Sequence, residues 1–305
     1  MQHIRKILAL VLLLIFLGST GVMIHQQLQK QESSQSVQAA EKIAAITGTA
    51  EVPPLSQPSQ KQASPLSEVL LAPTYTAPDT LQAVNQALTE VPQLIAQSLD
   101  ITSWLPVVDD ANTDSLLCID IDALQEVNPD VLGWFLIPGT NISYPLLQGE
   151  DNHYYLDYTW NNRKSFVGSI FMECTSAPAL SDFNTIIYGH NLGDTHMFST
   201  LTKYRSQNYW SEHPYAYIVN ESGAYRYQIF AAYQAGTDAE TFRLRFLGPD
   251  PKQAFLEDAL ASSVIETGIT PTASDRILTL STCVRGDPSS RWIVQARLEG
   301  QLNPS

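Results

Sequence analysis

The sequence predicts a mainly β domain, either an antiparallel barrel or a sandwich, in the C-terminal part of a chain of 305 residues. Short segments rich in alternating apolar and β-branched residues recur along this part, and Gly, Pro, Asn and Asp separate them. About eight short strands in one domain are typical of these two architectures. The expected strands cover residues 131–137, 142–147, 168–172, 185–188, 215–219, 225–232, 277–283 and 292–298.

Three helices are expected beside these strands. A short helix before the first strand should be capped by Asp120 or Asp122. A second helix carries apolar residues at helical spacing over residues 197–204. A third covers residues 250–264, where an Asp cap and a Pro at the first helical position mark its start. We expect this third helix to pack on the sheet just before the strand that ends in Cys283.

The first 25 residues are typical of a membrane anchor. Residues 7–24 form an uncharged stretch of 18 residues, and as a helix they would extend about 27 Å, close to the thickness of a bilayer core. Arg5 and Lys6 precede this stretch, so the positive-inside rule places the N-terminus in the cytoplasm and the rest outside. The alternative is a cleaved signal peptide. The lack of an A-x-A site favours a retained single-pass anchor, and both interpretations export the remainder.

Residues 26–114 are expected to form an extracellular spacer that is largely disordered. Residues 31–80 are rich in Pro, Gln and Ser and hold one aromatic residue, so they cannot bury enough apolar surface to offset the entropy of ordering. A marginal helix could begin at Asp79. The folded domain is then expected over residues 115–300, with residues 301–305 as a tail.

Composition excludes some partners and some disulfide patterns. The chain carries 17 Lys and Arg against 31 Asp and Glu, a formal net charge of −14. This balance argues against nucleic acid or an anionic lipid surface as the main partner, because both need a basic face. Three cysteines are too few for a disulfide framework and leave at least one free thiol. Cys118 and Cys174 could pair with each other, but we expect both to be buried thiols.

Three polar residues lie at the ends of expected strands, and they are His190, Cys283 and Arg291. Alternation along the Cys283 strand puts Ser281 on the same face as Cys283, and this polar face suits the floor of a groove better than a core. A hairpin after this strand would bring Arg291 alongside Cys283. The turn-rich connection of seven residues is longer than most hairpin loops, so we expect it to help cover a site.

These three residue types suffice for acyl transfer without a metal or cofactor. Cysteine attacks as its thiolate, whereas a free thiol with a pKa of about 8.5 is mostly protonated at neutral pH. A nearby imidazolium and guanidinium favour the anion, the imidazolium can protonate a leaving amine, and Arg can bind the oxyanion. Because His190 precedes Cys283, a papain-like hydrolase is disfavoured, and the sequence has no H-E-x-x-H or C-x-x-C motif for zinc. Each residue by itself is more often structural, so the combination carries the inference.

Several motifs resemble those of sortases, the membrane-anchored cysteine transpeptidases of Gram-positive bacteria. The stretch T-L-S-T-C at residues 279–283 resembles the TLxTC signature of that family, and Y-G-H-N at residues 188–191 resembles its His motif. Arg291 falls where the essential Arg of the family opens the last strand. The resemblance covers about residues 115–300, and features similar to class B sortases occur at residues 128–134, 137–140, 148–156, 168–172 and 251–264.

The resemblance implies an eight-stranded sortase β-barrel with N-terminal helices and a helix inserted before the Cys-bearing strand. Cys283 would attack the Thr carbonyl of a C-terminal sorting motif, His190 would protonate the departing amine, and Arg291 would hold the oxyanion. An amine of a peptidoglycan precursor or of a pilin Lys would then resolve the acyl-enzyme. The calcium site of some other sortases is not expected here, because the sequence shows no carboxylate cluster to support it, and no cofactor is expected. The resemblance also implies substrate-binding roles for Asn152, Leu156, Tyr188 and Ser281.

Two other functions remain open from the sequence. A cysteine protease of the same fold would release its product to water, and its hydrolysis would not respond to an added amine. A non-catalytic surface scaffold would keep the barrel without the chemistry, so Cys283→Ala would leave its phenotype intact.

Overall fold

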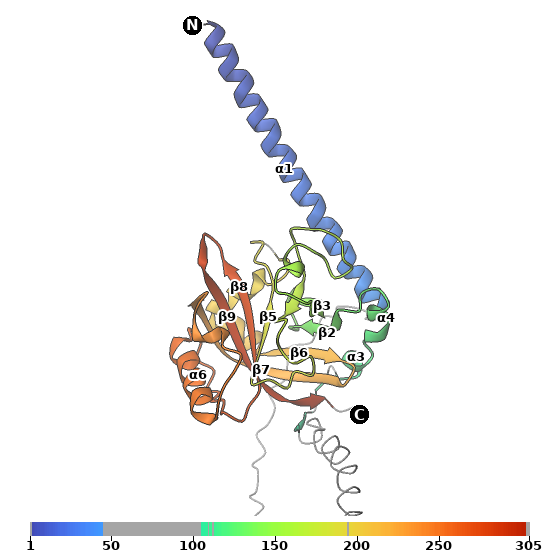
Figure 1. Ribbon diagram of the computed structural model, residues 1–305, viewed down its shortest axis with the longest axis vertical. Coiled ribbons are helices and arrows are strands. Elements are labelled where there is room, and N and C mark those ends of the chain that lie inside the picture. Colours follow the sequence, from blue (N-terminus) through green and yellow to red (C-terminus); the bar gives the residue numbers. More distant parts are fainter. Residues whose placement is uncertain (1, 45–104, 109, 112, 194, 303–305) are drawn as a thin grey trace, which may run out of the picture. The chain divides into compact units, whose positions relative to one another are not determined.

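The computed structural model describes residues 2–44, 105–108, 110–111, 113–193 and 195–302, with side chains from residue 20 onward. A closed barrel of eight strands dominates this part of the chain (Figure 1). Around the barrel the order is β9, β7, β6, β2, β3, β4, β5 and β8, and β8 pairs again with β9 to close it. The bounds are β2 Val131–Leu136, β3 Ser143–Leu147, β4 Ile170–Met172, β5 Asn184–Tyr188, β6 Tyr215–Asn220, β7 Gly223–Gly236, β8 Ile277–Val284 and β9 Asp287–Leu302.

All eight expected strands are present, and the closure by β8 and β9 decides for a barrel rather than a sandwich. The expectation of a purely antiparallel arrangement is wrong, because β3–β4 and β5–β8 are parallel pairs. A parallel pair needs a crossover of about a dozen residues or more. The long segments that follow β3 and β5 provide it, and no local strand pattern encodes that choice.

The helices around the barrel match the expected ones with local differences. The carboxylate of Asp120 accepts a hydrogen bond of 3.0 Å from the backbone N–H of Ala123, so Asp120 is the N-cap of α4. The helix before the Cys283 strand, α6, begins after Gly248, slightly earlier than expected. The single helix expected over residues 197–204 is a 3₁₀ segment, η2, followed by a short helix, α5. The bounds are α3 Thr113–Leu117, α4 Ile121–Gln125, η1 Tyr154–Leu156, η2 Ser199–Arg205, α5 Gln207–Glu212, η3 Glu240–Phe242 and α6 Pro249–Ser262.

Among the described residues, two apolar clusters pack the barrel against its helices. One buries the inner face of α6, including Phe255 and Leu256, against Phe230 and Ile293 of the barrel. The other joins α4 and the barrel, and it includes Trp134. Burying one such side chain contributes about 1.5–3 kcal/mol relative to leaving it exposed. The two clusters include residues of strands that carry the candidate site, with Phe171 of β4 in the second cluster and Ile277 of β8 in the first.

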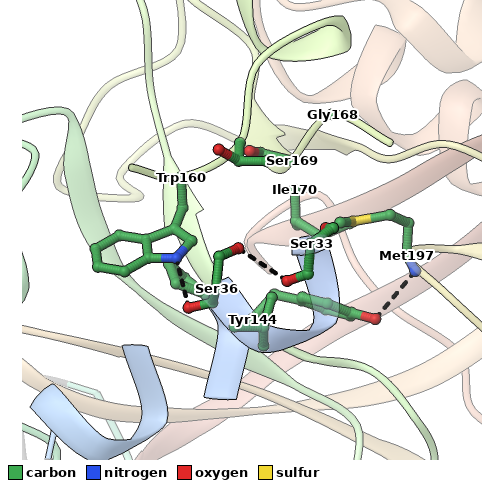
Figure 2. A pocket seen from close by; sticks show the side chains of 11 residues that line it. Ser33, Ser36, Tyr144, Trp160, Gly168, Ser169, Ile170 and Met197 are labelled. Atoms are coloured by element: carbon green, nitrogen blue, oxygen red, sulfur yellow. Dashed lines mark hydrogen bonds between the residues drawn. The ribbon is translucent and has the colours of Figure 1, made fainter. Parts of the chain in front are cut away.

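The N-terminal helix α1 spans Gln2–Ile43, and its second half packs on the barrel (Figure 1). This corrects the expectation that the spacer is disordered from residue 31 onward. The indole N–H of Trp160 donates to the backbone carbonyl of Ser36 (Figure 2), over a distance of 2.9 Å. The hydroxyl of Ser34 lies 2.9 Å from Nε2 of His196. Ala40 is fully buried in the same interface. This half of α1 is therefore part of the folded unit.

The spacer expectation is also wrong at its other end. A short strand, β1 (Val107–Val108), pairs in parallel with the end of β9, and α3 follows it. The strand β9 in turn continues to Leu302, beyond the expected start of the tail. The helix expected to begin at Asp79 lies outside the described residues, as do residues 45–104 and 303–305.

Within the residues whose side chains the structure describes, no helix has both the length and the apolar character needed to cross a membrane. The apolar stretch at residues 7–24 lies mostly outside those residues, although its backbone is helical within α1.

Candidate active site

Cys283 and Arg291 face each other across the hairpin formed by β8 and β9. The two residues are paired in register, so their side chains leave the same face of the hairpin. Directly opposed residues of an antiparallel pair have Cβ atoms about 4.5–5.5 Å apart. The side chains of Arg291 and Cys283 therefore leave the backbone next to each other, as the expected hairpin implied.

The connection between these strands is shorter than expected. It consists of Arg285 and Gly286, with Gly286 at a φ of 82°, and the other residues of the supposed loop belong to the strands. Two-residue hairpin turns favour residues with positive φ, and glycine adopts it without strain. The turn is thus tight, and a register shift between Val284 and Cys283 then places Cys283 opposite Arg291.

His190 lies just beyond the end of β5, which runs parallel to β8 and pairs Tyr188 with Ser281. Bonds between the strands continue past this pair. The hydroxyl of Thr282 donates to the carbonyl of Gly189 at 2.7 Å, and the side-chain amide of Asn191 donates to the carbonyl of Cys283 at 2.9 Å. These two bonds flank His190 in the sequence, so they tie its loop to the end of the Cys283 strand.

The imidazole of His190 is oriented by the backbone. Its Nε2 lies 2.8 Å from the carbonyl oxygen of Leu156. Because a carbonyl oxygen only accepts, Nε2 carries a proton and Nδ1 is the nitrogen left for proton exchange. Gly168, at a φ of 62°, lies beneath the ring, and a Cβ there would be 3.0 Å from Cδ2 of His190.

One cavity of about 350 Å³ brings together all seven site residues expected from the sequence. Three residues that the sequence analysis did not single out also contribute to its wall. The lining residues are Asn152, Leu156, Phe171, Tyr188, Gly189, His190, Ser281, Thr282, Cys283 and Arg291.

Ser281 is only 2% exposed, and within the described part of the chain its hydroxyl has no hydrogen-bond partner. A buried polar group without a partner is costly, by about 1–3 kcal/mol. Because Ser281 also lines the cavity, a bound substrate can supply the missing bond.

A buried carboxylate, Glu173, lies behind the cavity wall and was missed by the sequence analysis. Its Oε2 accepts from Nδ2 of Asn152 at 2.6 Å and from the hydroxyl of Tyr188 at 3.0 Å. Burial by itself would raise the pKa of Glu173, but hydrogen bonds from Asn152, Tyr188 and Thr175 outweigh it and hold that pKa below its ordinary value. Burial and the nearby Glu173 raise the pKa of Tyr188, so the phenol keeps its proton.

All three cysteines are free, and the expectation that Cys118 and Cys174 are buried is wrong. Cys118 is exposed and Cys174 is half-buried. Burial and the adjacent Glu173 raise the pKa of Cys174, which makes its thiolate less available. No cluster of three or more His, Cys, Asp or Glu that could hold a metal ion occurs among the described residues.

Comparisons with known proteins agree with this geometry. Residues 135–299 match the family model described as the Sortase domain. The chain belongs to the sortase family. Sortase B of Staphylococcus aureus is 35% identical over 179 residues, which make up 58% of this chain and 73% of that protein. Sortase B of Listeria monocytogenes is 37% identical over 180 residues, or 57% of this chain and 72% of that protein.

The fold supports the same assignment to class B sortases. A solved Staphylococcus aureus sortase B–substrate complex superposes with a TM-score of 0.57 at 30% identity, and the match covers 72% of this chain and 96% of that chain. As a class B sortase, the chain is a cysteine transpeptidase that anchors surface proteins. Sortases are associated with the membrane or the cell wall, and they act on proteins with a sorting motif and on amine acceptors.

Proposed function

We propose that Cys283 is the nucleophile of this transpeptidase, His190 its general acid and base, and Arg291 the residue that holds the oxyanion. The observation that carries the proposal is the in-register pair of Cys283 and Arg291, next to a His190 loop bonded to the same strand. In the first step the thiolate attacks the carbonyl carbon of Thr in a C-terminal sorting motif. The tetrahedral intermediate then collapses to a thioester, and the C-terminal fragment leaves as an amine.

His190 supplies the proton for the departing amine from Nδ1, because Nε2 is engaged with the carbonyl of Leu156. In the second step the same nitrogen takes a proton from the incoming amine, which attacks the thioester. Leu156 lines the cavity as well, so it contacts the substrate side of the site while its backbone orients the imidazole.

Arg291 uses one guanidinium nitrogen, Nη1, to hold its own strand. This nitrogen donates to the carbonyls of Pro288 at 2.9 Å and Ser290 at 3.0 Å. A guanidinium has five N–H donors, so three remain on Nε and Nη2. These donors can hold the substrate carbonyl and the oxyanion that develops from it.

The sorting motif occupies the cavity and contacts Asn152, Leu156, Tyr188 and Ser281. Support comes from the position of these residues in the cavity wall and from the buried Ser281 hydroxyl, which has no hydrogen-bond partner among the described residues. The acceptor is an amine of a peptidoglycan precursor or of a pilin Lys. The anchor is the apolar stretch at residues 7–24, a single membrane pass with the N-terminus in the cytoplasm and the barrel outside, supported by the uncharged sequence and by the continuous helix α1.

The test uses the full chain in detergent micelles with a library of fluorogenic peptides that share a Thr before the cleaved bond. Each peptide is incubated with and without triglycine, and the products are identified by mass spectrometry. We expect a Thr–triglycine ligation product, its loss in Cys283→Ala, and its retention in the control Cys118→Ala. Hydrolysis that does not respond to triglycine would instead indicate a protease, and turnover by Cys283→Ala would refute the proposed nucleophile.

A further inference from the structure

Glu173 connects two walls of the cavity without lining it. The residue follows β4 and is only 6% exposed. Its partners come from distant parts of the chain, since Asn152 lies in the segment after β3 and Tyr188 ends β5. Both partners line the cavity.

The two oxygens of the carboxylate have different tasks. Oε2 faces the cavity wall and accepts from Asn152 and Tyr188. Oε1 holds the turn after β4, where it accepts from the backbone N–H of Thr175 at 3.3 Å, from the Thr175 hydroxyl at 3.1 Å, and from the thiol of Cys174 at 3.4 Å. The groove-facing and turn-facing functions of this residue can therefore be separated by mutation.

The contacts also fix which way the amide of Asn152 points. Its Oδ1 accepts from the backbone N–H of Cys174 at 2.8 Å, and its Nδ2 donates to Glu173 at 2.6 Å. A backbone N–H can only donate and a carboxylate can only accept, so the amide cannot be reversed. One N–H of Asn152 remains for the cavity. The hydroxyl of Tyr188, which donates to Glu173, offers only oxygen lone pairs there.

We propose that Glu173 is a positioning residue that sets the hydrogen-bond polarity of the substrate groove, holding Asn152 as a donor and Tyr188 as an acceptor. The groove then selects a peptide segment that presents a carbonyl oxygen to Asn152 and an N–H or O–H to Tyr188. This inference rests on the proposed function, because it concerns the same peptide site. It adds a specificity role for a residue that does not touch the substrate.

The carboxylate is suited to this task because it is held as an anion. The hydrogen bonds that converge on it keep its pKa below the ordinary value of a Glu despite burial. Hydrogen bonds to a charged acceptor are also stronger and shorter than neutral ones, which agrees with the 2.6 Å contact to Asn152.

The first variant is Glu173→Gln, which keeps the shape but replaces one oxygen by a donor. The amide oxygen should occupy the Oε1 position, because that position accepts from the backbone and side chain of Thr175 and from Cys174. The new NH₂ group then faces the donors of Asn152 and Tyr188. With the library peptide that the wild type cleaves fastest, we expect KM to rise about ten-fold, equivalent to ~1.4 kcal/mol, while kcat changes less than about two-fold. The matched control, Thr175→Val, removes only a turn-side bond and should leave both constants at their wild-type values.

The second variant, Asn152→Asp with Glu173→Gln, reverses the donor and acceptor of this pair. The amide introduced at position 173 can donate to the carboxylate introduced at position 152, and the backbone N–H of Cys174 keeps an acceptor. The thermal midpoint should therefore return toward the wild-type value. The groove now presents a carboxylate where it presented an N–H, so cleavage should stay at least about ten-fold impaired (~1.4 kcal/mol) although the fold is restored.

Wild-type kinetics measured in parallel distinguish a failure of the proposed function from a failure of the positioning role of Glu173. If the wild type cleaves no peptide of the library, the proposed function fails and the inference fails with it. If the wild type is active but Glu173→Gln keeps its KM, or Thr175→Val is impaired equally, the positioning role alone is refuted. Recovery of wild-type kcat/KM in the double variant would also refute the positioning role. If Glu173→Gln is too unstable to purify, the double variant alone provides the test.

Discussion

Nε2 of His190 lies 2.8 Å from the backbone carbonyl of Leu156, which assigns the two ring nitrogens different tasks. The carbonyl holds the proton on Nε2, and Nδ1 is left to exchange protons with substrate. Leu156 also forms part of the cavity wall. The segment that lines the cavity therefore also orients the imidazole that we propose as the general acid and base.

Gly168→Ala tests whether the Leu156 carbonyl orients the imidazole of His190. The new Cβ would lie 2.7 Å from the carbonyl oxygens of Tyr155 and Leu156 and 3.0 Å from Cδ2 of His190. These contacts must shift the carbonyl that orients the imidazole. We expect a loss of kcat of about ten-fold (~1.4 kcal/mol) with little change in KM, measured by peptide cleavage.

The control for this variant is Gly268→Ala. Gly268 has a φ of 70°, close to the 62° of Gly168, but a Cβ there has nothing within 4 Å. Both variants place Ala in left-handed backbone, which costs about 1–2 kcal/mol of stability. Gly268→Ala should lose stability and keep its kcat, and equal kcat losses in both variants would show that strain alone is responsible.

Asn191→Ala removes the bond from its side-chain amide to the carbonyl of Cys283. This bond ties the His190 loop to the strand of Cys283, the proposed nucleophile, so its loss should misalign His190 and Cys283. A neutral hydrogen bond contributes about 0.5–1.5 kcal/mol, which corresponds to a kcat reduced roughly two- to ten-fold. Asn220→Ala is the control, because the side chain of Asn220 accepts from the nearby backbone N–H of Ser222 in an exposed turn. An unaltered kcat in Asn191→Ala would contradict the proposed role of this bond.

Ala40→Leu tests the docking of α1 on the barrel. Ala40 is fully buried against the barrel, whereas its neighbour Ala39 is exposed. Extra methylenes in a packed interface cost about 1–3 kcal/mol. Ala40→Leu should therefore lower the free energy of unfolding by this amount, while Ala39→Leu leaves it near the wild-type value. Equal stability of both variants in urea titrations would mean that α1 does not pack as described.

The stability contributed by Glu173 should depend on pH with a defined sign. Its pKa is lower in the folded state than in the unfolded state. The contribution is therefore fully present at neutral pH. It begins to be lost when the pH falls below about 4.3, the pKa of an ordinary Glu, and is gone once the pH has passed below the lower pKa of the folded state. The stability gap between wild type and Glu173→Gln should be largest near pH 7 and should narrow at acid pH. A gap that stays constant with pH would show that the charge of Glu173 is not involved.

The sequence predicted the strands well, because strands leave a local signal, and the residues that it singled out for the site all line one cavity. Period-two alternation marks a strand wherever it sits in the barrel. The polar face of the Cys283 strand indicated a groove before the partners of Cys283 were known. The pairing order was not predictable in this way, since the parallel neighbours β3–β4 and β5–β8 depend on crossovers rather than on local pattern.

The docked half of α1 and the role of Glu173 left no comparable signal. The buried positions of α1 are small residues, including Ser33 and Ala40, which allow close approach but give a weak hydrophobic period. The stretch therefore resembled a polar spacer. Glu173 is one acidic residue among 31 Asp and Glu, and its partners, Asn152 and Tyr188, become neighbours only when the barrel closes.

The most direct test of the central claim is the mass of the acyl-enzyme. The variant Cys118→Ser with Cys174→Ser leaves Cys283 as the only thiol of the chain. After a short incubation with the best-cleaved library peptide in the absence of amine, acid quenching and peptide mapping should show the N-terminal peptide fragment attached to Cys283 as a thioester. His190→Ala and Arg291→Ala should each reduce its rate of formation at least about 100-fold, or ~2.7 kcal/mol. Cleavage of the peptide without any adduct on Cys283 would contradict the account.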